Sequence, residues 1–299
     1  MKRIVLLSLL AASALLPPPA AWAQAYPSKP IRFIMPYPPG GSSDILARPI
    51  AIEMTKNLGQ SVLIEYKPGG GSTIGADFIA KSPPDGYTII MLLTAHAINA
   101  SLMPSLPYDT VKDFASITLA ATLPLVVVVN AQAPIQTLQD LIGAAKANPG
   151  KLNYGSAGPG NTSHLAVEYF NSVVGVKITH VPYKGSGPAV AGLLGREVDL
   201  MFDSLSSSLG QIQAGRFRAI GVSTAKRSPV LPQVPTLNES GLNGFETTAW
   251  WALFAPAALA PGIAAKLRDE TKLIVNAEAF REKLVDVGVQ PASGTTQPF

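Results

Sequence analysis

The segment from Met35 to Arg48, MPYPPGGSSDILAR, has the composition of an anion-binding loop. Gly40 and Gly41 permit unusual backbone angles and close approach of a ligand, and Ser42 or Ser43 can cap the helix that is expected to follow. Free N–H groups at a helix start, together with the positive end of the helix dipole, attract a carboxylate or a phosphate. A capped tight turn without any ligand has the same composition, so this segment alone leaves both interpretations open.

Asp44 lies in the first turn of this predicted helix, where its own carboxylate already satisfies the dipole. Arg48 follows four residues later, so the two side chains can form an ion pair. Two roles stay open for Asp44: it braces Arg48, or it faces the site and binds an ammonium or hydroxyl group of a ligand.

A second segment of the same kind, YGSAGPGNTSHLAVEYF, runs from 154 to 170. Glycines precede Asn161, Thr162 and Ser163, which can cap another helix. An ordinary strand-to-helix loop is the alternative interpretation. If the segment lies in a second domain, the two loops can face one cleft and hold one anion between them.

Other chemistry has less support. A P-loop needs Lys followed by Ser or Thr after its glycines, and neither PPGGSSD nor GGGSTIG supplies that pair. An enzyme needs a nucleophile with a base, but Ser156 is not in a G-x-S-x-G elbow, and the histidines His96, His164 and His180 form no recognisable motif. The chain has no cysteine, and no spacing of His, Asp and Glu indicates a metal site. We expect no cofactor and no metal, and a secreted α/β hydrolase with a triad assembled in three dimensions stays the weaker alternative.

Strand and helix signals alternate along the chain, which is the pattern of a parallel sheet with helices on both faces. Strands are expected at 31–35, 61–66 and 87–92, and helices at 43–58 and 74–81. In open α/β sheets ligands bind beyond the carboxyl ends of the strands, which is where both glycine loops fall.

Two extended runs, 115–130 and 247–262, interrupt this alternation and are interpreted as crossovers between two domains. The first domain is then discontinuous, comprising 26–124 and 246–299, with the second domain, 125–245, inserted between its parts.

Residues 1–25 have the features of a cleaved secretory signal peptide: two basic residues, an apolar run, and small residues before cleavage after Ala23 or Ala25. The apolar run is shorter than the roughly 20 residues that span a bilayer.

Without the two basic residues of the signal, 21 of the 23 Lys and Arg remain against 19 Asp and Glu, and no basic cluster with aromatics indicates nucleic-acid binding. Export without a cysteine for lipid attachment favours the periplasm, although a secreted enzyme also fits.

The ordered motifs resemble those of one known family, the substrate-binding proteins of tripartite tricarboxylate transporters, also called the Bug family of periplasmic receptors. The resemblance runs from about Tyr26 to the end of the chain. It is carried by the two glycine loops and by KPGGGSTIGADFIAKSPPDGYTI, VPYKGSGPAVAGLLGREVDLMFDSL, KRSPVLPQVPTLNESG and WWALFAPA.

The resemblance implies a type II periplasmic-binding fold, with two α/β domains joined by two crossover strands and closing on a ligand. It implies that the ligand carboxylate is held by amides and hydroxyls of 40–43 and 157–163, with further cleft-lining stretches at 70–73, 94–96 and 183–184. The candidate ligand-binding residues are Tyr37, Gly40, Gly41, Ser42, Ser43, Asp44, Gly71, Ser72, Thr94, His96, Ser156, Ala157, Thr162, Ser163, Tyr183, Asp203 and Trp250.

The expected function is that of a monomeric extracytoplasmic receptor that captures a small carboxylate and delivers it to integral-membrane transporter subunits. A partner that presents the same ligand to a signalling protein is the alternative, because no motif separates the two roles. Family members usually continue past the segment that matches SGTTQPF, whereas this sequence stops at Phe299, and whether this end is natural does not follow from the sequence. Nor does the identity of the carboxylate.

Overall fold

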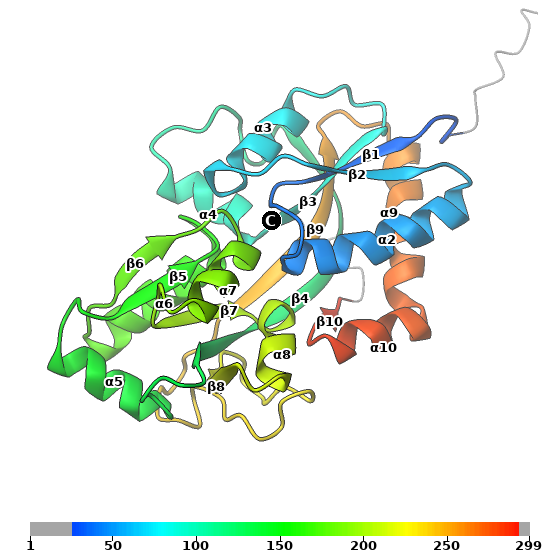
Figure 1. The fold of residues 1–299 in the computed structure, drawn as a ribbon. Helices are drawn as coiled ribbons and strands as arrows, with labels where there is room; N and C mark the ends of the chain where they lie inside the picture. Colours follow the sequence, from blue (N-terminus) through cyan, green and yellow to red (C-terminus); the bar gives the residue numbers. More distant parts are fainter. Residues whose placement is uncertain (1–25, 293–299) are drawn as a thin grey trace, which may run out of the picture.

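A computed structural model describes residues 26–292. Ten strands form one curled sheet, with the order β2-β1-β3-β9-β4-β7-β5-β6 and with β8 and β10 also paired to β4. Helices pack around both ends of this sheet, so the described chain forms two α/β lobes (Figure 1). The predicted signal peptide, residues 1–25, and the segment 293–299 lie outside the described residues.

The first lobe is built from both ends of the described chain. In chain order its elements are β1 (Ile31–Met35), α2 (Ser42–Leu58), β2 (Val62–Tyr66), the short helix η2 (Gly70–Ser72), α3 (Thr73–Ala80), β3 (Thr88–Leu93), α4 (Thr94–Leu102), the first part of β4 (Phe114–Asn130), β9 (Thr248–Pro256), α9 (Pro261–Asn276), α10 (Glu278–Asp286) and β10 (Gln290–Pro291).

The second lobe contains the middle of the chain, shown in green and yellow in Figure 1. Its elements are the second part of β4, α5 (Leu138–Ala147), β5 (Asn153–Ser156), α6 (Thr162–Val174), β6 (Thr179–Pro182), α7 (Ser186–Leu194), β7 (Leu200–Ser204), α8 (Leu205–Gln213) and β8 (Phe217–Val222).

The first lobe shows how the sequence pattern produces these elements. β1 pairs in parallel with both β2 and β3, and β3, with the sequence TIIMLL, is buried along its whole length. A strand of a parallel sheet that helices cover on both faces needs such a continuous apolar run. The predicted strands and helices of this part of the chain are confirmed to within one residue at each end.

The long strand β4 belongs to both lobes. Its first part, up to Pro124, pairs with β9, whereas its second part, from Leu125, pairs with β7 and β8. The main chain next crosses between the lobes just before β9, where the Thr247 N–H donates to the Ser223 carbonyl. The α/β class is thus confirmed, and the chain crosses between the lobes twice, once within β4 and once just before β9. The predicted domain limits 26–124, 125–245 and 246–299 stay a prediction. Within 26–292, no helix is both long enough and apolar enough to cross a membrane.

Candidate functional site

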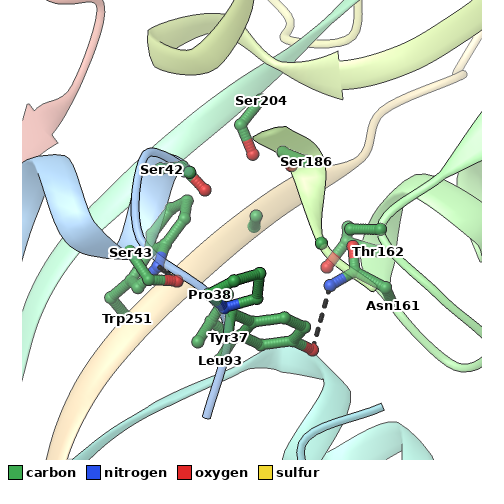
Figure 2. Close-up of a pocket in the computed structure, with 14 residues that line it drawn as sticks. Tyr37, Pro38, Ser42, Ser43, Leu93, Asn161, Thr162, Ser186, Ser204 and Trp251 are labelled. Atoms are coloured by element: carbon green, nitrogen blue, oxygen red, sulfur yellow. Dashed lines mark hydrogen bonds between the residues drawn. The ribbon is translucent and has the colours of Figure 1, made fainter. Parts of the chain in front are cut away.

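A cavity lies between the two lobes, beyond the carboxyl ends of β1, β3, β5 and β7 (Figure 2). Its volume is about 20 Å³, on the order of the space that one water molecule needs. Its walls come from both lobes and carry no formal charge. The fourteen lining residues are Tyr37, Pro38, Gly41, Ser42, Ser43, Leu93, Ala157, Asn161, Thr162, Gly185, Ser186, Ser204, Ala249 and Trp251.

Five helices begin at this cavity. Their N-cap residues, which immediately precede the first turn, all line it: Gly41 for α2, Leu93 for α4, Asn161 for α6, Gly185 for α7 and Ser204 for α8. In every one of these helices except α6, no side chain caps the first turn. Their first-turn N–H groups can therefore serve as donors to a ligand, and each N-terminus adds roughly half a positive charge.

Hydroxyl groups add further donors to the wall. Ser43 Oγ accepts a hydrogen bond of 3.2 Å from the indole N–H of Trp251, so its own O–H can donate to a ligand. The hydroxyls of Ser42 and Thr162 form no hydrogen bond with another residue in 26–292 and point toward the cavity from opposite lobes (Figure 2). The wall is thus rich in donors although it has no cation.

Direct contacts hold the lobes together around the cavity. Asn161 Nδ2, of the second lobe, donates a hydrogen bond of 3.1 Å to the Tyr37 hydroxyl of the first lobe (Figure 2). Gly71 approaches Pro159 so closely that a Cβ atom at position 71 would lie 2.6 Å from the Pro159 carbonyl oxygen. The lobes are therefore in contact in this structure, and the cavity between them has room for a group about the size of one water molecule.

The second glycine loop, between β5 and α6, is fixed by internal hydrogen bonds. Ser163 Oγ accepts from the Ala157 N–H at 2.9 Å and donates to Asn161 Oδ1 at 3.0 Å. Ser156 Oγ accepts from the Gly158 N–H at 3.1 Å. Ser156 and Ser163, both predicted ligand contacts, lie behind the cavity wall and shape the loop whose Ala157 and Thr162 line it.

Ser156 also lies beside a histidine. The distance from its Oγ to His180 Nε2 is 2.6 Å, the kind of pair that a hydrolase requires. However, Ser156 has 0% exposed surface and is not a cavity-lining residue. Burial, and then the neighbouring His164, lower the pKa of His180 to about 4. The His164 and His180 rings stack 4.2 Å apart, and the geometry assigns the cluster to bracing the loop.

Asp44 is engaged by three donors at the start of α2. Its carboxylate accepts hydrogen bonds from the Gly40 N–H at 3.1 Å, from Arg48 Nε at 2.8 Å and from the Tyr66 hydroxyl. Burial alone would raise the pKa of Asp44, but the bonds from Tyr66, Arg48 and Gly40 together hold it below its ordinary value. Asp44 and Gly40 are absent from the cavity wall, which favours the bracing role for Asp44.

His96 and Trp250 lie apart from the central cavity. Both line another cavity, of about 320 Å³, on the first lobe. Burial lowers the pKa of His96 to about 4, and its Nε2 lies 3.1 Å from the Thr110 carbonyl oxygen. Thr94 Oγ1 accepts from the Trp250 N–H at 3.0 Å. On the same strand, Trp251 lines the central cavity, because alternate residues of a strand face opposite sides.

An outer cavity of about 260 Å³ adjoins the central one, since Tyr37 and Ala157 line both. It contains the predicted residues Gly71 and Tyr183, and the hydroxyl of Tyr183 donates to Glu197 at 2.9 Å. Ser72 is fully buried next to Gly71, with φ +85°. The lining residues of the outer cavity are Tyr37, Gly69, Gly70, Gly71, Met103, Ala157, Gly158, Pro159, Pro182, Tyr183 and Lys184.

The central wall also contains residues that were not among the candidates from the sequence, including Gly185, Ser186, Ser204 and Trp251. The first three carry the same signal as the two glycine loops, a strand end followed by Gly or Ser at a helix start. Asp203, which was a candidate, is fully buried one position before Ser204 and does not line the cavity.

Comparisons with known proteins show similarity to one family. Residues 46–299 match the sequence model described as "Tripartite tricarboxylate transporter family receptor". Protein BugT of Bordetella pertussis is 36% identical over 275 residues, which cover 91% of this chain and 84% of that protein.

Two solved structures from Rhodopseudomonas palustris have the same fold as this chain. One, determined with adipate, has a TM-score of 0.88 and 35% identity, covering 90% of this chain and 91% of the other. The second, MatC with bound malate, has a TM-score of 0.85 and 33% identity, covering 89% and 90%. The chain therefore belongs to the tripartite tricarboxylate transporter receptor family, the Bug-type periplasmic solute-binding proteins that its motifs resemble.

Proposed function

We propose that this protein is an extracytoplasmic receptor that captures a small carboxylate between its lobes and delivers it to membrane transporter subunits. The observation that carries the proposal is the convergence of five helix N-termini on one uncharged cavity. Gly41, Ser42, Ser43, Thr162 and Ser186 supply the amides and hydroxyls that hold the carboxylate.

Burying an anion is costly unless hydrogen bonds replace its water. N–H and O–H groups aimed at the carboxylate provide that replacement, and bonds to a charged acceptor are about twice as strong as neutral ones. A primary amide of the same acid would bring N–H donors of its own against a wall of donors. The cavity therefore favours carboxylates over their amides. The adipate and malate in the two related structures support this ligand class.

The remainder of the ligand extends into the outer cavity when the lobes close. The outer cavity is larger than the central cavity and is lined mostly by glycines and by aromatic or aliphatic groups. Lys184 is exposed at its wall and has no ion-pair partner in the described part of the chain. It can attract a second acidic group at the far end of a ligand.

The proposal includes export to the periplasm by cleavage of the signal peptide 1–25, and action as a monomer that docks on a transporter. Membership of a periplasmic receptor family supports this location. Presentation of the same ligand to a signalling protein is the alternative, and it would use the same cavity.

A thermal-shift screen of the mature protein tests the ligand class. The panel pairs each acid with its amide, including adipate with adipamide and malate with malamide. A ligand that binds only the folded state, present at a concentration of 100 times its Kd, raises the free energy of unfolding by about 2.7 kcal/mol and therefore raises the Tm. We expect shifts with one or more acids and none with the matched amides. Equal shifts for acids and amides, or no shift with any acid, would contradict the proposed function.

A further inference from the structure

Asp203 is a buried carboxylate without a cation. It has 0% exposed surface at the end of β7. Its Oδ2 accepts a hydrogen bond of 2.7 Å from Ser208 Oγ, whereas Oδ1 has no hydrogen-bond partner among residues 26–292. Burial raises the pKa of this carboxyl to about 6, even though the Ser208 hydroxyl, the nearby Ser186 hydroxyl and the backbone of Ser204 favour the ionised form.

The elements packed against Asp203 supply no compensating charge. Asp203 shares the sheet face of Met201, which packs with α7 and α8. Neither of these helices contains an ionisable residue, and neither does β4, the strand paired with β7. The ionisable groups of other neighbouring elements are engaged elsewhere: Tyr154 with Glu168, His164 with His180, Arg218 with carbonyls of 131–135, and Asp44 with Arg48.

The same carboxylate adjoins the central cavity through two residues of the cavity wall. Ser204, the next residue, is the N-cap of α8, and Ser186 is the first residue of α7. A ligand carboxylate in the cavity would share these two helix N-termini with Asp203. Two carboxylates in a region closed from water disfavour each other's ionised form, so one of them gains a proton.

We propose that Asp203 takes up one proton from solvent when a carboxylate binds, so that the receptor captures the acid anion and a proton together. The inference rests on the proposed function. When Asp203 is ionised, the Ser186 hydroxyl is drawn toward it. When Asp203 is neutral, that hydroxyl is free to donate to the ligand. Asp203 acts through Ser186 and is a positioning residue.

Calorimetric titration of the full mature protein with adipate tests the inference at pH 7 and pH 8, where adipate is fully ionised. If adipate gives no thermal shift, the acid of the panel with the largest shift takes its place. Titrations in phosphate and in Tris, whose ionisation enthalpies differ, give the number of protons bound. We expect uptake approaching one proton at pH 8 and affinity up to about tenfold weaker at pH 8 than at pH 7.

Asp203→Asn supplies a neutral side chain of the same shape. It should abolish the proton uptake and make the affinity equal at the two pH values. Asp199→Asn is the matched control, because Asp199 is a partly exposed carboxylate just before the same strand, and it should keep both effects. If Asp203→Asn does not fold, the ¹³C carboxyl resonance of Asp203 in the unmodified protein reports its ionisation with and without the acid.

Two results would overturn the inference: a bound acid that brings no proton, or an Asp203→Asn protein with the same uptake as the unmodified one. Either result leaves the proposed function standing, because the acid still binds. Failure of every acid in the panel to bind would instead overturn the proposed function, and the inference with it.

Discussion

Replacing Gly71 with alanine should weaken ligand binding by preventing full closure of the lobes. A Cβ atom at this position would lie 2.6 Å from the Pro159 carbonyl oxygen of the opposite lobe, and backbone atoms cannot rotate away. Ordinary contact begins near 3.4 Å, so the lobes must part by about 0.8 Å at this point. A radial gap of about 0.5–1 Å forfeits a quarter to a half of each dispersion contact, and the short donor contacts to a carboxylate lengthen as well.

The expected loss of affinity is at least tenfold, or about 1.4 kcal/mol. Gly71 has φ +63°, so alanine there also costs about 1–2 kcal/mol of stability through the left-handed backbone alone. Gly175→Ala is the matched control, because Gly175 has φ +69° and no atom within 4 Å of the added methyl group. Both variants should lower the Tm of the free protein to a similar extent, whereas only Gly71→Ala should raise the Kd.

Calorimetric titration with the best acid of the panel measures the two Kd values. The reasoning is refuted if Gly71→Ala binds as tightly as the unmodified protein, or if Gly175→Ala loses as much affinity. The first result would mean that the ligand-bound lobes do not meet at Pro159, and the second that backbone strain, not closure, controls binding.

Three further predictions concern single side chains. Ser43→Ala should weaken acid binding about tenfold or more, because a hydrogen bond to a charged group contributes roughly 1.5–3 kcal/mol and Trp251 already orients the Ser43 hydroxyl; unchanged affinity would remove Ser43 from the site. Lys184→Gln should weaken binding of a diacid such as adipate about three- to fivefold, as expected for an exposed charge, without affecting the monoacid hexanoate. Lys151→Gln is the control, because Lys151 is an exposed lysine of the same lobe that lies before the start of β5, whereas Lys184 lies beyond the carboxyl end of β6. Equal effects of the two variants would disprove a local role for Lys184. Asp44→Asn should lower the free energy of unfolding by about 1–2 kcal/mol at pH 7 in urea titrations. Because the folded state lowers the pKa of Asp44 below 3.8, this contribution is present above that value and is lost as the pH falls through the folded-state pKa. A difference between variant and parent that persists undiminished at pH 2 would contradict this sign.

Local patterns were enough to predict the elements around the first glycine loop. The apolar run 31–35 predicts a strand, and the Gly and Ser residues at 40–43 predict a helix start, because both signals depend on neighbours in the chain. The expected cap by Ser42 or Ser43 is wrong, since the helix already includes both serines, its N-cap is Gly41, and no side chain in the described chain caps its first turn. The ion pair of Asp44 with Arg48 is equally local, being one helical turn long.

The composition of the cavity depends on contacts between segments far apart in the chain. Ser186 and Ser204 carry ordinary capping signals, and many strand ends in this chain carry similar ones. They reach the same cavity as Ser43 because the order β1-β3-β9-β4-β7-β5 places their strand ends together. No short stretch of sequence contains that order, since it arises from pairing between residues 46 to 164 positions apart.

Trp250 and Trp251 show the same difference between what the local sequence predicts and what strand pairing determines. Alternation along a strand predicts that the two indoles face opposite sides, and the sequence supports nothing more specific. Pairing of β9 with β3 on one side and with β4 on the other, including two register shifts along β4, turns Trp251 toward Ser43 and the cavity. The chain's own residues thus predict an α/β fold with glycine-rich loops at its strand ends. Which side chains line the central cavity follows instead from sheet order and register, because only these bring distant strand ends to one point.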